Sequence, residues 1–348
     1  MRQVLIFVLL GILLALPVRA MEFEAPAPPE SAAELLPKEA DSFGAGLWNV
    51  VSAAAELVSP SLTEAASCCL RVFGAVLLTA MVGQFAPGIS RRTLELAGVA
   101  AVAVLLLEPS ASLIELGLET VQQLQDYGKL LLGVMASALA ARGGVTSSTT
   151  LYVGTAFFDT LLGTAVTTVF LPMLWMYLAL SIAHGAVGEV MLNRIRKFLR
   201  WMMEWALKLT LYVFTGYMAI TGVVSGTADA AAGKAAKIAI SGAVPVVGGI
   251  LSDAADAVLL GAATLGSGAG IWGILTVLAI FCMPAIRIGC QYLLLKLTAA
   301  AAESMGGLRC AAVAGDFAGM LGLLMALVST QTVLLLISTV SFLRGVSG

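Results

Sequence analysis

Residues 151–183 read LYVGTAFFDTLLGTAVTTVFLPMLWMYLALSIA, and Asp159 is the one charged side chain in this stretch. A transmembrane helix needs about 20 consecutive apolar residues, so the stretch is longer than one ordinary span and barely long enough for two. Pro172 removes a backbone donor and favours a kink in a helix. The stretch therefore predicts one long or broken membrane helix with its kink at Pro172.

The composition of the whole chain agrees with a membrane location. Of 348 residues, 59% are hydrophobic and 11% are charged, whereas about 25% of the residues in a soluble domain are charged. Other apolar blocks predict spans at about 70–85, 94–107, 205–224, 271–284 and 317–342. Glu108 and Pro109 end the second of these blocks, and an amphipathic stretch follows it. We expect an all-α polytopic membrane protein with about six transmembrane helices plus amphipathic or re-entrant helices.

The N-terminal part of the chain has the features of a secretory signal followed by an acidic arm. Residues 1–20 combine a basic start, a short apolar run, Pro17 and small residues at the cleavage-specifying positions, which predicts cleavage after Ala20. An uncleaved first membrane helix is disfavoured because the apolar run is too short. Residues 21–66 form an acidic, Pro-rich extracytoplasmic arm, and residues 67–348 form the multi-spanning helical domain. Within the arm, 43–58 has helical spacing of apolar residues and lies either on the membrane surface or against soluble parts of the protein.

Basic residues predict the orientation of the chain in the cell membrane, because an excess of Lys and Arg marks cytoplasmic loops. Two clusters act as topology determinants: Arg91 with Arg92, and Arg194, Arg196, Lys197 and Arg200. A predicted inner loop after Pro284 adds Arg287, Lys296 and Arg309. The N-terminus that remains after signal removal is then extracytoplasmic, as is the C-terminus. One short basic loop does not indicate nucleic-acid binding.

Few side chains suggest chemistry. Charged residues inside or beside the spans are Asp159, Glu189, Lys208, Arg287 and Lys296. A charged side chain inside a membrane is energetically costly and therefore suggests a function. Of these residues, only Asp159 lies well inside an apolar block. If the segment before Pro172 lies on the membrane surface, Asp159 is merely interfacial.

The cysteines and the histidine are expected to be structural. The 5 cysteines include no CxxC pair and are expected to be buried free thiols, while His184 is expected at a helix end. The sequence contains no metal-ligand spacing, Walker loop or dinucleotide fingerprint, so we predict no metal, no cofactor and no enzymatic activity.

An interrupted segment, 222–268, follows the fourth predicted span and reads GVVSGTADAAAGKAAKIAISGAVPVVGGILSDAADAVLLGAATLGSG. Its apolar pieces, 238–251 and 257–265, are too short to cross a bilayer. It is either a re-entrant or broken hairpin, or an extracytoplasmic helical hairpin lying on the bilayer. The candidate functional residues of this segment are Asp229, Lys234, Lys237, Pro245, Gly248, Gly249, Ser252 and Asp253.

The same segment resembles the stage III sporulation protein AE family of endospore-forming bacteria. The resemblance is carried by Gly222–Ser225, Ala228–Asp229, Lys234 with Lys237, Ala239–Ser241 and, above all, Pro245–Ala254. It extends from about Leu70 to the C-terminus, whereas the acidic arm matches no pattern of that family.

The resemblance implies a scaffold or export-gate subunit of a channel-like secretion complex between mother cell and forespore, placed in the mother-cell membrane around the forespore. The implied partners are proteins of the same sporulation operon, including a cytoplasmic ATPase and ring-forming anchored proteins, and the family has no established catalytic residues. Recurring small residues also favour close helix packing, which is compatible with a homo-oligomer. The alternative is a secondary transporter or permease that uses the interrupted segment as a broken-helix substrate site.

Overall fold

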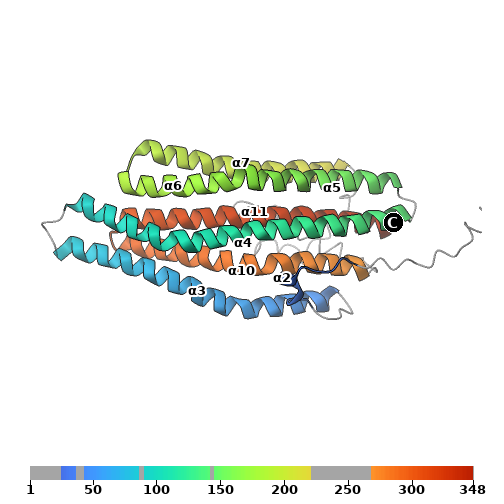
Figure 1. Ribbon diagram of the computed structural model, residues 1–348, viewed down its shortest axis with the longest axis horizontal. Helices are drawn as coiled ribbons and strands as arrows, with labels where there is room; N and C mark the ends of the chain where they lie inside the picture. Colours follow the sequence, from blue (N-terminus) through green and yellow to red (C-terminus); the bar gives the residue numbers. More distant parts are fainter. Residues whose placement is uncertain (1–24, 37–42, 86–89, 142–144, 221–267, 348) are drawn as a thin grey trace, which may run out of the picture.

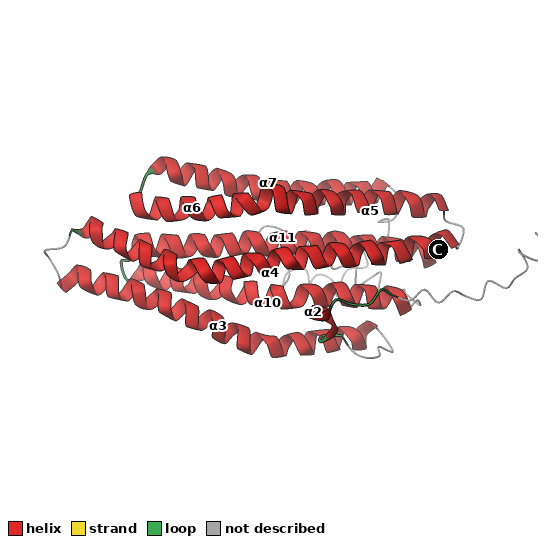
Figure 2. Cartoon of the chain, viewed as in Figure 1, coloured by secondary structure: helices red, strands yellow, loops and turns green. Residues whose placement is uncertain are grey.

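The computed structural model describes residues 25–36, 43–85, 90–141, 145–220 and 268–347. Helices account for nearly all of these residues, and the described ranges contain no strand (Figure 2). The expected all-α membrane fold is confirmed. The predicted signal peptide at 1–20 and most of the interrupted segment 222–268 lie outside the described residues.

Long helices run side by side along one axis of the molecule (Figure 1). In chain order the elements are α2 (Glu30–Ala33), α3 (Phe43–Phe85), α4 (Arg91–Ala141), α5 (Val145–Ala165), the π-helical η1 (Val166–Phe170), α6 (Leu171–Val187), α7 (Val190–Ile220), α10 (Gly268–Ser304) and α11 (Leu308–Ser347). Helices α3, α6 and α10 end, and α4, α7 and α11 begin, at one end of the bundle, on the left of Figure 1, which we call the turn end.

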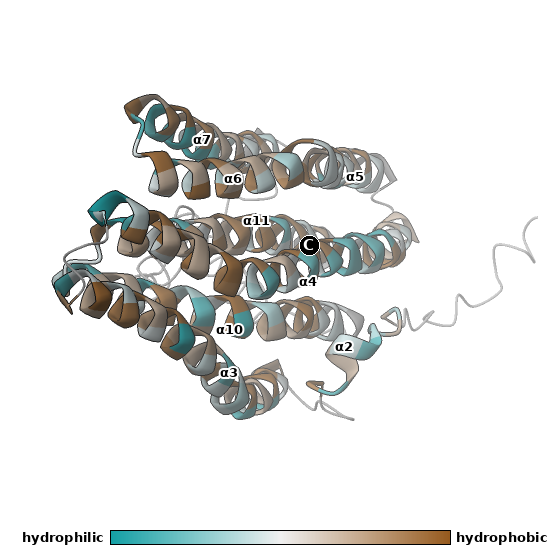
Figure 3. Ribbon diagram, turned by 60° about the vertical axis from the view of Figure 1, so that its left-hand side comes forward, coloured by the Kyte–Doolittle hydropathy of each residue, from teal (hydrophilic) through white to brown (hydrophobic). Residues whose placement is uncertain are grey.

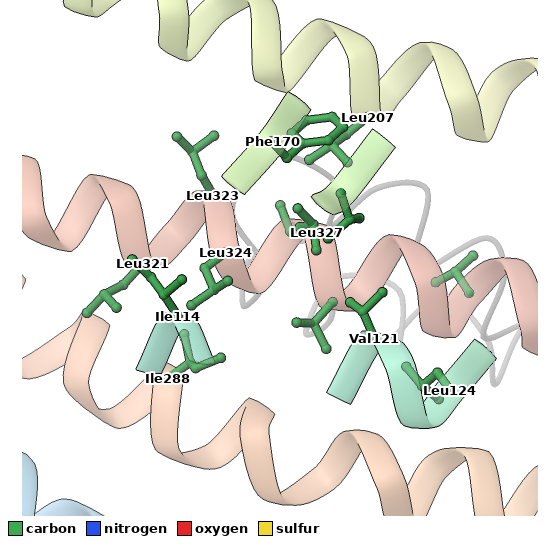
Figure 4. Packing of buried hydrophobic residues seen from close by; sticks show 14 of the residues in the cluster. Ile114, Val121, Leu124, Phe170, Leu207, Ile288, Leu321, Leu323, Leu324 and Leu327 are labelled. Carbon is green, nitrogen blue, oxygen red and sulfur yellow. The ribbon is translucent and has the colours of Figure 1, made fainter. Parts of the chain in front are cut away.

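Helix α11 occupies the middle of the bundle and is buried along almost its whole described length. Its leucines Leu321 and Leu324 lie beside Ile114 of α4 and Ile288 of α10 (Figure 4). A helix that is apolar on every side must be enclosed by other helices or by lipid, and here the other helices enclose it. The core of the protein is therefore built around α11.

The outer faces of the surrounding helices are also hydrophobic (Figure 3). Leu78 and Phe85 of α3, Phe157 of α5, and Trp201 and Trp205 of α7 are all more than half exposed. Such a surface is unfavourable in water and favourable against lipid. Five described helical segments are long and apolar enough to cross a membrane: Phe43–Phe85, Arg91–Ala141, Ser148–Val187, Gly270–Ser304 and Leu308–Leu343.

The span predicted at 205–224 lies mainly in α7, which is not one of these five. Residues 221–224 are outside the described ranges. Helix α7 is amphipathic: it buries Leu199, Met203 and Leu207 at spacings of four residues and carries several charged side chains.

The structure joins segments that the sequence divided. Helix α3 continues through Pro60 and past residue 66, so the predicted surface stretch 43–58 and the first span are one helix.

The prediction that a helix ends at Glu108 and Pro109 is wrong, because α4 contains Pro109 and runs to Ala141. A proline inside a helix costs about 3 kcal/mol. In α4 that cost is offset by packing on both sides of the proline, where Leu106 and Ile114 are buried.

Helix α4 is too long to be accommodated inside a bilayer. Its 51 residues correspond to about 76 Å at about 1.5 Å per residue, compared with a hydrocarbon core of about 30 Å. The bundle therefore projects well beyond the hydrocarbon core.

The prediction of a loop after Pro284 is also wrong, because α10 is helical through Ser304. Ile288, Leu295 and Ala302 are buried at helical spacing, so packing maintains the helix. Arg287 and Lys296 are exposed side chains of α10.

The long apolar stretch 151–183 lies in one continuous helical segment, Ser148–Val187, which agrees with the prediction of one long or broken helix. Between α5 and α6 the backbone adopts the five-residue π-helical segment Val166–Phe170, directly before Leu171 and Pro172. A π-helical turn changes the hydrogen-bond register next to a residue that has no N–H to donate.

The described part of the acidic arm packs against the bundle. In and after α2, Ala32 and Leu35 are buried, and the Ser31 hydroxyl donates a hydrogen bond of 2.6 Å to the Gln123 side chain of α4.

Candidate functional site around Asp159

Asp159 lies inside the bundle, on the side of α5 that faces its neighbours, and only 3% of it is exposed. The Nε2 atom of Gln331, on α11, donates a hydrogen bond to Oδ1 of Asp159. Gln331 is itself fully buried. A buried carboxylate requires such donors because it has lost its hydrating water. The Asp159–Gln331 contact therefore joins α5 to the central helix.

A second glutamine binds the backbone of the same residue. Nε2 of Gln125, on α4, donates a hydrogen bond of 2.9 Å to the Asp159 carbonyl oxygen. One turn further along α5, a Cβ atom at Gly163 would overlap the Gln125 amide. Glycine at position 163 therefore leaves the space through which α4 reaches α5.

More polar side chains are buried near this contact. Thr155 lies one turn before Asp159 on α5 and is fully buried, and so are Ser329 and Thr330, next to Gln331 on α11. Thr330 donates to the Ala326 carbonyl at 2.7 Å. By contrast, Thr155 Oγ1, Ser329 Oγ and Gln331 Oε1 have no hydrogen-bond partner among the described residues.

This arrangement is suited to holding helices in place. Hydrogen bonds between polar side chains fix the register of helices that pack through otherwise interchangeable apolar surfaces. Within the part of the chain that the structure describes, no group of His, Cys, Asp and Glu is placed to hold a metal ion. We call Asp159, Gln331 and Gln125 the polar clamp.

The second basic cluster is divided between ion pairs and solvent. Arg196 of α7 forms an ion pair with Asp316 of α11, and both side chains are largely buried. Burial lowers the pKa of the Arg196 guanidinium, but an arginine remains charged in proteins. Arg200 pairs with Glu204 at 2.8 Å. Arg194 and Lys197 are exposed.

The first basic cluster lies at the turn end. Arg91, in the first turn of α4, pairs with Glu95 through Nε at 3.1 Å. The other oxygen of Glu95 lies 3.0 Å from Nε of Arg309, and Nη1 of Arg309 donates to the Ala186 carbonyl of α6 at 3.2 Å. Arg92 is exposed. The basic residues of the two clusters thus gather toward one end of the bundle, and the side of the membrane that this end faces remains a prediction.

Comparison with known proteins gives the family. Residues 50–343 match the family model described as Stage III sporulation protein AE. The chain belongs to this family. A curated AE-family protein, "Stage III sporulation protein AE" of Bacillus subtilis (strain 168), is 24% identical over 189 residues, which cover 54% of this chain and 47% of that protein. The aligned region thus spans about half the length of that relative. No solved structure matches the chain.

The AE-family match is longer than the resemblance found in the sequence. It begins at residue 50, within α3, whereas the sequence suggested a start near Leu70. The three residues of the polar clamp and the two basic clusters lie within the matched residues.

The eight candidate residues of the interrupted segment, from Asp229 to Asp253, lie outside the described residues of this AE-family protein. The segment joins the end of α7 to the start of α10. Both of these helix ends lie opposite the turn end (Figure 1).

The cysteines and the histidine occupy the kinds of places that the sequence indicated. All five cysteines are free; Cys68, Cys69 and Cys310 are buried, while Cys282 and Cys290 are half-buried. His184 lies in the last turn of α6, with Nδ1 at 3.1 Å from the Glu189 carbonyl oxygen.

The sequence did not identify Gln331 or Asp316 as functional partners. A signal was present for Gln331, since it stands with serine and threonine neighbours inside an otherwise apolar span. Gln125 and Gly163 had no distinguishing pattern.

Proposed function

We propose that this protein is a non-enzymatic membrane component, a scaffold or export-gate subunit, of the secretion complex that connects mother cell and forespore during sporulation. The observation that carries the proposal is the family match over residues 50–343, which includes most of the helical bundle. The proposed location is the mother-cell membrane around the forespore, and the proposed partners are products of the same operon, including its cytoplasmic ATPase and ring-forming anchored proteins.

The packing of the bundle favours a scaffold. Within the described ranges, α11 fills the axis of the bundle, and residues such as Phe317, Leu327 and Leu334 are buried. A pore through the middle of these helices would require that core to open. A gate assembled from several copies, or a scaffold that supports other subunits, requires no such opening.

The length of the helices also suits an assembly component. Because α4 is longer than the hydrocarbon core is thick, part of its surface is available outside the bilayer. Partners that belong to rings on one side of the membrane, or to the cytoplasm on the other, would contact such projecting surfaces.

Deleting the gene in the host tests the proposal. We expect sporulation to stop after engulfment and to resume when the gene is restored, and normal spores from the deletion strain would refute the proposed role. Copurification of the complex then shows whether the protein is present as one copy or as a ring.

The rival function is secondary transport, and the buried carboxylate of Asp159 is the observation that favours it. The two functions differ in what the isolated protein does. Uptake of a solute into liposomes that contain only this protein would support transport. Translocation that requires the operon partners would support the scaffold.

A further inference from the structure

A pocket of about 410 Å³ opens at the turn end, between the α3–α4 pair and the turn from α10 to α11. It is lined by residues that include Thr79, Arg91, Leu94, Glu95, Met305 and Arg309. Its volume is within the range of about 300–1,000 Å³ typical of small-ligand sites. The polar clamp contributes no residue to it, so the pocket is a separate feature of the molecule.

The charged groups of the pocket favour an anion. Arg91 and Arg309 both approach Glu95, which holds the two guanidinium groups beside the pocket. Two arginines against one glutamate leave a net positive charge, and the neighbouring Arg92 is exposed. The side chain of Arg91 is 84% exposed, so its terminal nitrogens remain accessible. Arginine binds phosphate oxygens well because its donors match their geometry.

The rest of the lining favours a lipid as the source of that anion. Leu94, Met305 and Leu308 line the pocket with apolar side chains. Met305 and Leu308 are 41% and 59% exposed, so this apolar lining continues from the pocket to the surface of the bundle. The pocket also lies where four candidate spans end, since α3 and α10 finish there and α4 and α11 begin there. With this end at the headgroup level, the part of the bundle that exceeds the hydrocarbon core projects from the opposite end.

We propose that this pocket binds the phosphate group of an anionic phospholipid, whose acyl chains leave the pocket past the exposed side chains of Met305 and Leu308. Basic pockets between membrane helices are known to hold acidic headgroups. The lipid would connect the α3–α4 pair to the α10–α11 turn. The inference depends on the membrane location of the protein and not on its proposed role in sporulation.

Binding of short-chain phosphatidylglycerol to the purified full-length protein in uncharged detergent tests the proposal. Native mass spectrometry counts the bound lipid, with short-chain phosphatidylcholine as the zwitterionic comparison. We expect phosphatidylglycerol to be retained preferentially, and R91Q to weaken it by about fivefold, the effect of removing one basic residue near a membrane surface. R194Q is the matched control, because Arg194 is also exposed near the turn end but does not line the pocket.

Two further variants separate binding from folding. E95Q removes the negative charge of the pocket and should strengthen retention of phosphatidylglycerol, whereas a damaged fold would weaken it. A80L fills the pocket without changing its charge and should weaken retention, since Ala80 lines the pocket.

Several outcomes would overturn the lipid assignment. Equal losses in R91Q and R194Q would indicate general surface attraction, and unchanged retention in R91Q would exclude the pocket. Inorganic phosphate that displaces the lipid at equal concentration would indicate a site for a free anion. Failure of any of these tests leaves the gene-deletion result unaffected, so the two proposals are judged separately.

Discussion

The amide of Gln331 in the central helix α11 donates a hydrogen bond to the carboxylate of Asp159 in α5, and both side chains are almost completely buried. The two residues are separated by 172 positions in the chain. Their contact ties the most enclosed helix of the bundle to one of its outer helices.

Replacing Gln331 by leucine should destabilise the protein, because it leaves the Asp159 carboxylate without this donor. A buried polar group that loses its partner costs about 1–3 kcal/mol. Thermal unfolding in detergent measures the effect. The double variant Q331L/D159L removes both polar groups and should recover part of the loss. A single Q331L variant as stable as the wild type would contradict the role of the clamp.

Gly163→Ala should also destabilise the bundle, because the new methyl group overlaps the Gln125 amide. Overpacking of this kind typically costs about 1–3 kcal/mol. Gly133→Ala is the matched control: it lies in α4, and nothing is within 4 Å of the position of its Cβ. That substitution should be neutral or stabilising, since alanine favours a helix over glycine by about 1 kcal/mol. In a Gln125→Ala background the cost of Gly163→Ala should fall, and an unchanged cost would show that the overlap is unimportant.

Asp316→Ala should loosen α7, because it leaves the Arg196 guanidinium largely buried without its ion-pair partner. Breaking a buried ion pair typically costs about 3–5 kcal/mol of folding free energy. We expect a loss near the lower end of this range, because both side chains retain some exposure. Limited proteolysis in detergent should cleave α7 faster in this variant. Arg194→Ala serves as the comparison, since an exposed residue on the same helix should change stability by less than about 0.5 kcal/mol. Equal proteolysis of both variants would argue against the ion pair.

Single cysteines introduced at Arg92, Lys197 and Met305 in a cysteine-free background should react with a membrane-impermeant reagent from the same side. All three positions are exposed. Arg92 and Lys197 stand near the starts of α4 and α7, and Met305 stands between α10 and α11, so all three belong to the parts of the chain nearest the turn end. The positive-inside rule predicts the cytoplasmic side. Labelling from outside at all three would reverse the predicted orientation, and labelling from different sides would contradict a common end.

Local patterns in the sequence were sufficient for some elements and misleading for others. The apolar stretch 151–183, with Pro172 near its middle, predicted one long or broken helix because hydrophobicity and a missing backbone donor act locally, and one continuous helical segment is observed. Pro109 gave the opposite result. Its local cost is overcome by the burial of α4 residues on both sides against helices that come much later in the chain. The helix through Arg287 and Lys296 was missed for a related reason, since exposed charges on one side of α10 concealed the buried positions on the other.

The sequence by itself determined the class of this protein, its helical content and its family, because each depends on composition, apolar run length or a contiguous block of residues. It also singled out Asp159, since a charge inside an apolar run is conspicuous. The tertiary structure alone decided which residues meet that charge and which basic residues form ion pairs. Gln331 meets Asp159 across 172 positions, and Arg196 of α7 meets Asp316 of α11. No local spacing predicts such contacts, because they arise only when several long helices have packed around α11.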